Sequence, residues 1–130
     1  MARTITGTVA QEAKGGGLKH FSARINNYGD VFKKATGVDL FPGTINVVVD
    51  RAIPVKADFK IDGADINEPE QDLLFERCLI NDIPAFRIRP FQPKTGKGGW
   101  GDHVLEISSA RKIENVEPGC TVTISFFRDI

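Results

Sequence analysis

Most of the chain alternates apolar and polar residues over short segments that are separated by glycine, proline and asparagine. This period of two is typical of half-buried β-strands, because successive side chains of a strand point to opposite faces of a sheet. Turn residues add detail: Asn81-Asp82 predicts a hairpin, and Glu117-Pro118-Gly119 predicts a type II turn. The predicted strands are residues 4–10, 45–49, 73–81, 83–88, 104–108 and 121–127, with at most an edge strand in the irregular stretch 55–71.

One segment follows a helical period instead. Between residues 27 and 36 the apolar positions recur at intervals of three and four, which predicts one short amphipathic helix. Gly37 is predicted to end it, because glycine readily adopts the left-handed conformation that follows a helix. The apolar positions of this helix are Tyr28, Val31, Phe32 and Ala35.

Six or seven short strands and one helix predict a mainly β fold. Glycine-rich connections favour a small closed β-barrel over an open sheet, since closure removes exposed strand edges. The 130 residues suffice for one substantial core, so we predict a single barrel domain over residues 1–130. No apolar run approaches the roughly 18 residues of a membrane-spanning helix. We therefore expect a cytoplasmic protein without a membrane partner.

Charge and cysteine content exclude several classes of function. The 17 basic and 17 acidic residues leave no net charge to attract nucleic acid, and the phenylalanines are scattered, so no nucleic-acid partner is expected. No obligate protein partner is evident. Cys78 and Cys120 lie in apolar runs, too far apart for a zinc knuckle, and are predicted to be reduced core residues. His20 and His103 are predicted to be loop or surface residues.

A glycine-rich segment near the N-terminus is the first candidate site. Three consecutive glycines between two lysines would let backbone amides converge on an anion, as a triphosphate site requires. The sequence does not match a Walker loop, and a flexible hairpin tip is the alternative interpretation. The residues are Lys14, Gly15, Gly16, Gly17, Leu18 and Lys19.

Thr44 and Asn46 form the second candidate site. They are two residues apart at the start of a predicted strand, so their side chains should project to the same side. Neutral oxygens of this kind suit Mg²⁺ when bound phosphates supply the negative charge. Alternatively, Thr44 caps the preceding turn and Asn46 bonds a neighbouring backbone group.

Glu106 is the third candidate, because a carboxylate between Leu105 and Ile107 is unusual in a buried strand. Facing a pocket, it could accept a proton from a substrate hydroxyl; facing solvent, it would be an ordinary polar strand residue. In the preceding hairpin, Arg87 and Arg89 should share one face. Residues 90–102 are rich in glycine and predict a surface loop.

Several segments, taken in order, carry a family resemblance. They are Gly7-Thr8-Val9, the glycine loop ending in Lys19-His20-Phe21, the helix Tyr28-Gly29-Asp30-Val31-Phe32-Lys33-Lys34 with Gly37, Phe41-Pro42-Gly43-Thr44-Ile45-Asn46, Cys78-Leu79-Ile80, Arg87-Ile88-Arg89-Pro90, His103-Val104-Leu105-Glu106-Ile107 and Pro118-Gly119. Together they cover most of the chain, and in their order and spacing they resemble the archaeal-type CTP-dependent riboflavin kinase family.

The resemblance implies a cradle-loop barrel that transfers a phosphoryl group from CTP to the ribityl 5′-hydroxyl of riboflavin, giving FMN and CDP. By position, Thr44 and Asn46 match the family's Mg²⁺ ligands, and Lys14 to Lys19 match its nucleotide loop. Arg111 and Lys112 resemble a second nucleotide-contacting stretch, while Thr95 and Glu106 resemble its flavin contacts. Such a reaction depends on positioning and charge neutralisation more than on covalent catalysis.

Two other functions remain open. One is a related barrel kinase for a different small alcohol. The other is a flavin- or nucleotide-binding barrel without turnover, although such a module would have no need of the Thr44 and Asn46 pair.

Overall fold

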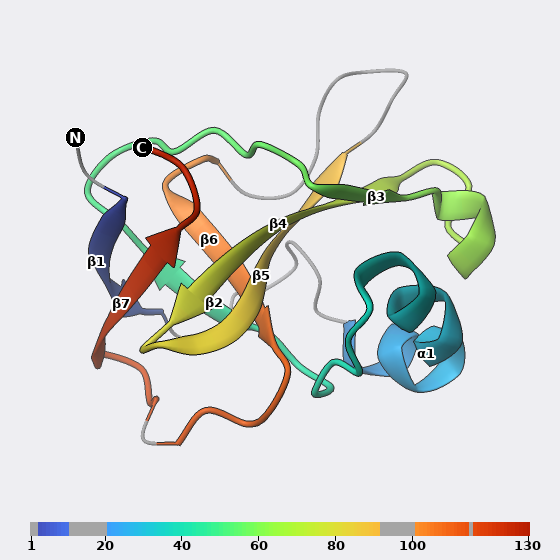
Figure 1. Cartoon of the computed structure of the whole chain (residues 1–130), viewed down its shortest axis with the longest axis horizontal. Coiled ribbons are helices and arrows are strands. Elements are labelled where there is room, and N and C mark those ends of the chain that lie inside the picture. The colour runs from blue at the N-terminus through green and yellow to red at the C-terminus, as the bar shows by residue number, and fades with distance from the viewer. Residues whose placement is uncertain (1–2, 11–20, 92–100, 115) are drawn as a thin grey trace.

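The computed structural model describes residues 3–10, 21–91, 101–114 and 116–130. Across these residues the chain forms seven strands, one α-helix and one 3₁₀ helix (Figure 1). The strands are β1 (Thr4–Val9), β2 (Ile45–Val48), β3 (Phe59–Ile61), β4 (Asp72–Ile80), β5 (Ile83–Phe91), β6 (Val104–Ser109) and β7 (Thr121–Phe126). The helices are α1 (Phe21–Thr36) and the 3₁₀ helix η1 (Gly63–Ile66).

Six of the strands close into an antiparallel barrel. The sheet order is β3-β4-β5-β6-β2-β1-β7, and β7 also pairs with β4, which joins the two ends. β7 pairs with β4 near Cys78–Ile80, whereas β3 pairs with its earlier half, opposite Leu73–Phe75. β3 is therefore an edge strand added outside the closed ring. The prediction of a small closed β-barrel with one helix is confirmed.

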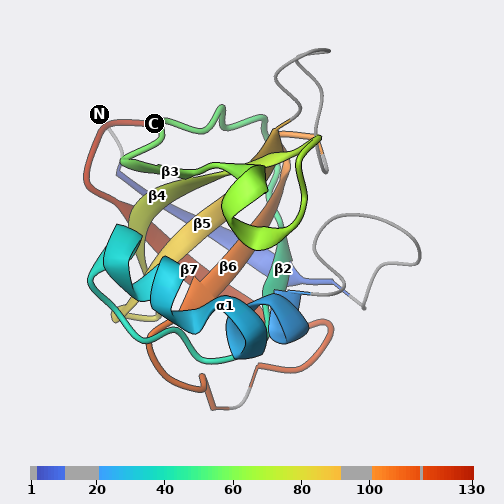
Figure 2. The same cartoon turned by 90° about the vertical axis from the view of Figure 1, so that its right-hand side faces the viewer.

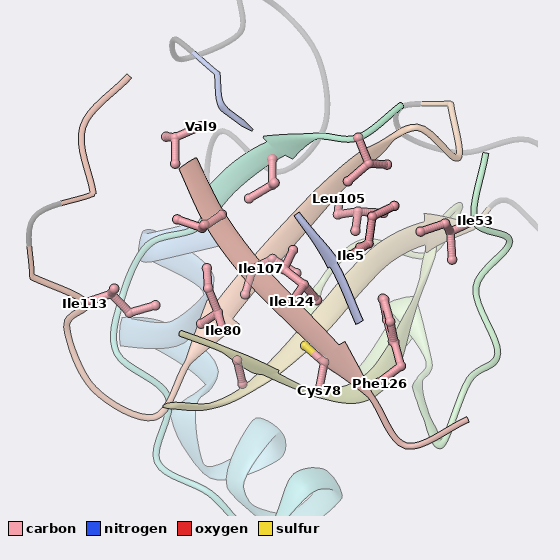
Figure 3. Packing of buried hydrophobic residues seen from close by; sticks show 14 residues of the cluster. Ile5, Val9, Ile53, Cys78, Ile80, Leu105, Ile107, Ile113, Ile124 and Phe126 are labelled. Carbon is pink, nitrogen blue, oxygen red and sulfur yellow. The ribbon is translucent and has the colours of Figure 1, made fainter. Parts of the chain in front are cut away.

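The interior of the barrel is filled by one face of every strand of the ring (Figure 3). Val47, Leu105 and Ile124 have no measurable exposure, which shows that the ring is packed with side chains and leaves no open channel. The buried residues of this interior cluster are Ile5, Val9, Val47, Val49, Ile53, Cys78, Ile80, Ala85, Leu105, Ile107, Ile113, Val122, Ile124 and Phe126.

A second cluster lies on the outside of the barrel, between the sheet and α1, which crosses in front of it in Figure 2. The ring centroids of Phe32 in α1 and Phe75 in β4 are 5.9 Å apart, and the rings are tilted by 58°. This helix-side cluster consists of Ile25, Phe32, Leu40, Ile61, Ile66, Leu73, Phe75, Phe86 and Ile88. The sheet thus has two covered faces, an interior face and a helix-side face.

The helix begins six residues before its predicted start at residue 27, so that boundary was wrong. Ile25 is buried in the helix-side cluster three residues before Tyr28, and it continues the apolar stripe towards the N-terminus. A local kink at Tyr28, with φ −129° and ψ 29°, interrupts the helix where the prediction placed its first turn. The predicted end is confirmed, because Gly37 has φ +77° and donates its N–H to the Lys33 carbonyl at 2.7 Å.

β5 is longer than predicted, since it includes Pro90 and Phe91, which the sequence placed in a loop. Pro90 is paired in register with Leu73 of β4. Among the described residues the pairing of β5 with β6 ends at Ile88, so this end of β5 pairs there with β4 alone. Proline fits such a position, because its missing N–H removes no bond from a second neighbour.

Several local predictions are confirmed. Asn81 and Asp82 both have positive φ, 47° and 65°, as the tight β4–β5 hairpin requires. The Glu117 turn is closed by the N–H of Cys120, 3.0 Å from the Glu117 carbonyl. Cys78 is buried, Cys120 packs against the interior cluster, and both are free thiols. His103 is exposed in the approach to β6. In the described part of the chain, no helix is long and apolar enough to cross a membrane.

Candidate functional site

Ser109, at the end of β6, holds together two segments that are far apart in the sequence. Its carbonyl accepts the N–H of Phe41 at 2.9 Å, which fixes the turn that leads into β2. Its hydroxyl donates to the Arg111 carbonyl at 2.6 Å, which fixes the chain just after β6. Ser109 therefore places the Thr44 segment beside the Arg111 and Lys112 segment.

A cavity of about 200 Å³ lies between these two segments. Thr44 contributes from the start of β2, and Lys112 contributes a positive charge from the other side. Gly43 also lines the cavity, and its φ of +125° lets the chain turn sharply before Thr44. The remaining lining residues are Phe41, Ile45, Ile107, Ser109, Ile113 and Val116. The lining is mostly apolar, and Thr44, Ser109 and Lys112 are its polar residues.

Glu106 lies on the helix-side face of β6, because Leu105 and Ile107 on either side of it fill the barrel interior. Its cross-strand partner on β5 is Ile88 of the helix-side cluster, and its cross-strand partner on β2 is Asn46. Glu106 is only 2% exposed. Its interpretation as a solvent-facing strand residue is therefore wrong.

Two oxygens beside Glu106 are buried and have no hydrogen-bond partner in the described part of the structure: Asn46 Oδ1 and Ser108 Oγ. Asn46 faces Glu106 directly across the β2–β6 ladder, and Ser108 follows Glu106 by two residues on the same face. A buried polar atom without a partner is costly, and in native proteins it marks a site for water, an ion or a ligand. We call Asn46, Glu106 and Ser108 the helix-side polar row.

Thr44 immediately precedes β2 and Asn46 lies within it, and the structure gives the two residues different surroundings. Thr44 lines the cavity that also contains Lys112, whereas Asn46 is not among the described residues that line it. Asn46 lies instead beside Glu106. Among the described residues no group of three or more His, Cys, Asp or Glu side chains is arranged to hold a metal ion, so the metal assignment rests on neutral oxygens.

A separate set of charged residues occupies one end of the barrel interior. Glu76 Oε2 accepts from Arg128 Nε at 2.5 Å, and Glu76 Oε1 accepts from Arg128 Nη2 and the Lys56 N–H, both at 3.1 Å. Arg89 Nη1 lies 3.3 Å from Asp102 Oδ1. We call these residues, together with Arg87, the interior ionic cluster.

Arg87 is the most deeply buried member of this cluster, at 1% exposed. Its Nη1 donates to the Ile53 carbonyl, and its Nη2 lies 3.7 Å from Asp102 Oδ1 without a hydrogen bond in the described structure. Burial lowers the pKa of Arg87 to about 10, although the charges of Asp102 and Glu76 oppose the change. The guanidinium therefore stays charged at neutral pH. The prediction that Arg87 and Arg89 share one face is confirmed, since both approach Asp102.

The other predicted site residues divide into two groups. Arg111 and Lys112 are exposed and follow the β6 end that Ser109 fixes. The glycine loop from Lys14 to Lys19, Thr95 and His20 lie outside the described residues. Sequence reasoning missed Ser108 and Ser109, because serine is ordinary in strands; only the spacing of two from Glu106 could have indicated Ser108.

The chain was compared with known protein families, and none matches it. A comparison with curated proteins likewise finds no matching relative. The function must therefore be argued from the site itself.

Proposed function

We propose that this chain is a Mg²⁺-dependent kinase that transfers the γ-phosphoryl group of a nucleoside triphosphate, CTP by resemblance, to the ribityl 5′-hydroxyl of riboflavin. One observation carries the proposal: a buried carboxylate, Glu106, stands directly across the β-ladder from Asn46, whose side-chain oxygen is buried without a hydrogen bond to any described residue. A proton acceptor beside an oxygen that can bind a metal ion is a pairing that suits phosphoryl transfer to an alcohol.

The residues present fit a magnesium ion. Asn46 Oδ1 is a neutral oxygen without a partner in the described structure, and Thr44 offers a hydroxyl two residues earlier. Mg²⁺ prefers oxygen ligands and is commonly held by one or two protein groups together with substrate phosphates. When bound, it would neutralise charge on the transferred phosphoryl group. Thr44 and Asn46 are the residues that would hold it.

In this proposal the nucleotide binds at the cavity beside Thr44. Lys112 lines it, and Arg111 adjoins Lys112 at the same exposed rim. At about 200 Å³ the cavity is smaller than the roughly 300–1,000 Å³ typical of a whole ligand site. It suits the phosphate end of a nucleotide better than a complete nucleotide. In this proposal Lys14 to Lys19 supply further phosphate contacts and Thr95 a flavin contact.

Glu106 acts as the general base in this proposal. It accepts the proton of the 5′-hydroxyl, while the hydroxyl oxygen bonds to the γ-phosphorus. The bond between that phosphorus and the β–γ bridging oxygen breaks, and CDP leaves with the electron pair, which yields FMN. Lys112 balances phosphate charge, and Thr44 and Asn46 fix the reacting groups in line.

The test is incubation of the protein with riboflavin, Mg²⁺ and each of the four nucleoside triphosphates, followed by separation of FMN from riboflavin. FMN should form, with CTP as the best donor. No FMN from any donor would reject the kinase; riboflavin binding without FMN would identify a non-catalytic flavin-binding barrel instead.

Thr44→Val and Asn46→Leu test the metal ligands, because both variants keep the branched shape of the side chain and remove the oxygen. Each should lower turnover by roughly 100-fold or more and raise the Mg²⁺ concentration needed for half-maximal rate, since metal stabilisation of the transition state is worth several kcal/mol. Thr6→Val, at an exposed position of β1, is the matched control and should keep the full rate. Wild-type Mg²⁺ dependence in both variants would reject this metal site.

A further inference from the structure

Ser108 is the one member of the helix-side polar row that the proposed function does not use. Its side chain is fully buried, at 0% exposed, and its hydroxyl has no hydrogen-bond partner in the described structure. Its cross-strand partner on β5 is Phe86, which belongs to the helix-side cluster. The hydroxyl therefore lies on the same face as Glu106 and cannot be satisfied from the barrel interior.

The atoms of the polar row that have no hydrogen bond in the described structure are both oxygens. Asn46 Oδ1 and the Glu106 carboxylate accept only, and a serine hydroxyl can both accept and donate. A phosphate beside Ser108, away from the Mg²⁺ that Asn46 would hold, would be repelled by the Glu106 carboxylate. A chain of alcohol groups, by contrast, could donate to Glu106 and exchange a hydrogen bond with Ser108, which leaves Asn46 to hold the metal.

We infer that Ser108 is a further substrate-binding residue, whose hydroxyl bonds the polyhydroxyl chain of the substrate beside Glu106. The inference rests on the proposed function, which brings the 5′-hydroxyl of a ribityl chain to Glu106. Ser108 lies two residues further along the same face of β6, about 7 Å away at the rise of a strand, so it contacts a hydroxyl further along that chain. Ser108 thus selects for the polyol part of the substrate and makes no contact with its ring.

Ser108→Ala tests this inference, because it removes only the hydroxyl. Riboflavin should bind about tenfold more weakly, whereas lumiflavin, which has the same ring with a methyl group in place of the ribityl chain, should bind as to the wild type. The unfolding temperature of the ligand-free protein should stay the same or rise by a few degrees, since the variant loses an unsatisfied buried group.

Ser125→Ala is the matched control. Ser125 is in β7, and its hydroxyl is within hydrogen-bond distance of Thr4 Oγ1, at 3.1 Å. This variant should keep wild-type affinity for both flavins. A Ser108→Ala variant with wild-type riboflavin affinity would overturn the inference, as would a fall in its unfolding temperature below that of Ser125→Ala, which would show that the hydroxyl is bonded without ligand.

The inference and the kinase proposal can fail separately. Titration with ribitol, the polyol chain alone, is measured beside riboflavin. If the wild type binds ribitol but makes no FMN, and Ser108→Ala weakens ribitol binding, the kinase fails and the polyol contact stands. If FMN forms but Ser108→Ala changes only the Mg²⁺ requirement, the kinase stands and the polyol contact fails. If the wild type binds neither ribitol nor riboflavin, both are rejected.

Discussion

Glu76 and Glu106 are both buried glutamates in strands of the same barrel, yet the oxygen atoms at the two positions differ in their hydrogen bonding. Glu76 is on the interior face, where Arg128 and the Lys56 N–H together occupy both of its carboxylate oxygens. Glu106 is on the helix-side face, where the oxygens of Asn46 and Ser108 on either side of it have no hydrogen bond within the described structure.

The difference teaches that burial of a charged residue does not by itself indicate a functional site. A buried carboxylate with a well-placed guanidinium is costly to disrupt, and removal of either partner leaves an uncompensated charge. Such a pair is a structural element. Neighbouring polar atoms that the protein leaves unbonded are the better indicator of a ligand, because the ligand can supply the missing bonds.

The most direct test of this difference is the same substitution in each of the two glutamates. Glu106→Gln should lower kcat by roughly 10²–10⁴-fold with little change in nucleotide affinity, the range for removal of a general base. Glu76→Gln should leave kcat per folded molecule unchanged, because Glu76 contacts Arg128 and not the helix-side row. Single-turnover formation of FMN, normalised to folded protein, measures both.

Two other results would revise the role of Glu106. A higher KM for riboflavin with an unchanged kcat would make it a binding residue, since binding common to ground and transition states spares kcat. Equal losses of kcat in Glu76→Gln and Glu106→Gln would remove the distinction between the two faces.

The next largest expected effect is a loss of stability when Arg128 is replaced. Arg128→Leu removes the hydrogen bonds to Glu76 and to the Pro54 carbonyl and leaves the buried Glu76 carboxylate without its hydrogen-bonded cation. The free energy of unfolding should fall by about 3 kcal/mol, as for other buried pairs that lose one partner. Urea denaturation measures it.

Arg3→Leu is the control for Arg128→Leu, because Arg3 pairs with Asp129 at 3.6 Å but its side chain is 67% exposed. An exposed ion pair contributes between zero and about 1 kcal/mol. Similar small losses in both variants would show that the Glu76 pair is no more structural than a surface pair.

The fold could be predicted largely from the sequence, because strands and tight turns are local features. The alternation of apolar and polar residues predicted the strands, and two turns were predicted from Asn81-Asp82 and Glu117-Pro118-Gly119. The start of α1 was missed because Ile25 joins the apolar stripe only across a kink. The end of β5 was missed because proline usually interrupts a strand. Pro90 is tolerated here because, among the described residues, it pairs with β4 alone.

The surroundings of the candidate site depend on contacts between distant residues, which local patterns do not encode. Glu76 and Arg128 are 52 residues apart, and Thr44 meets Lys112 only because Ser109 holds both segments. The sequence singled out Glu106 by its apolar neighbours, but its position beside Asn46 follows from the β2–β6 register alone. The unbonded Ser108 hydroxyl could be recognised only once its neighbours in space were known.

The smallest expected effect is on the pH dependence of stability, and it comes from Cys78 on the interior face. It lies two residues after Glu76 on that face, and burial, aided by the Glu76 charge, raises the pKa of its thiol from 9.0 to about 12. The unfolded thiol therefore ionises first as the pH rises, so the folded state holds more protons above pH 9. The stabilisation by the neutral thiol is complete below pH 9 and is lost as the pH rises towards 12.

Between pH 8 and pH 10 this ionisation should lower the free energy of unfolding by roughly 1 kcal/mol. Urea denaturation at both pH values should show the decline in the wild type and in Cys120→Ala, which retains Cys78, and a smaller decline in Cys78→Ala. The difference between the two variants isolates Cys78 from every other ionisable group, because the two variants share all of those groups except the two thiols. If Cys78→Ala declined as steeply as Cys120→Ala, the thiol would ionise as readily in the folded chain as in the unfolded one. The interior face would then admit water near Glu76, and Glu76 could no longer be distinguished from Glu106 as the purely structural carboxylate.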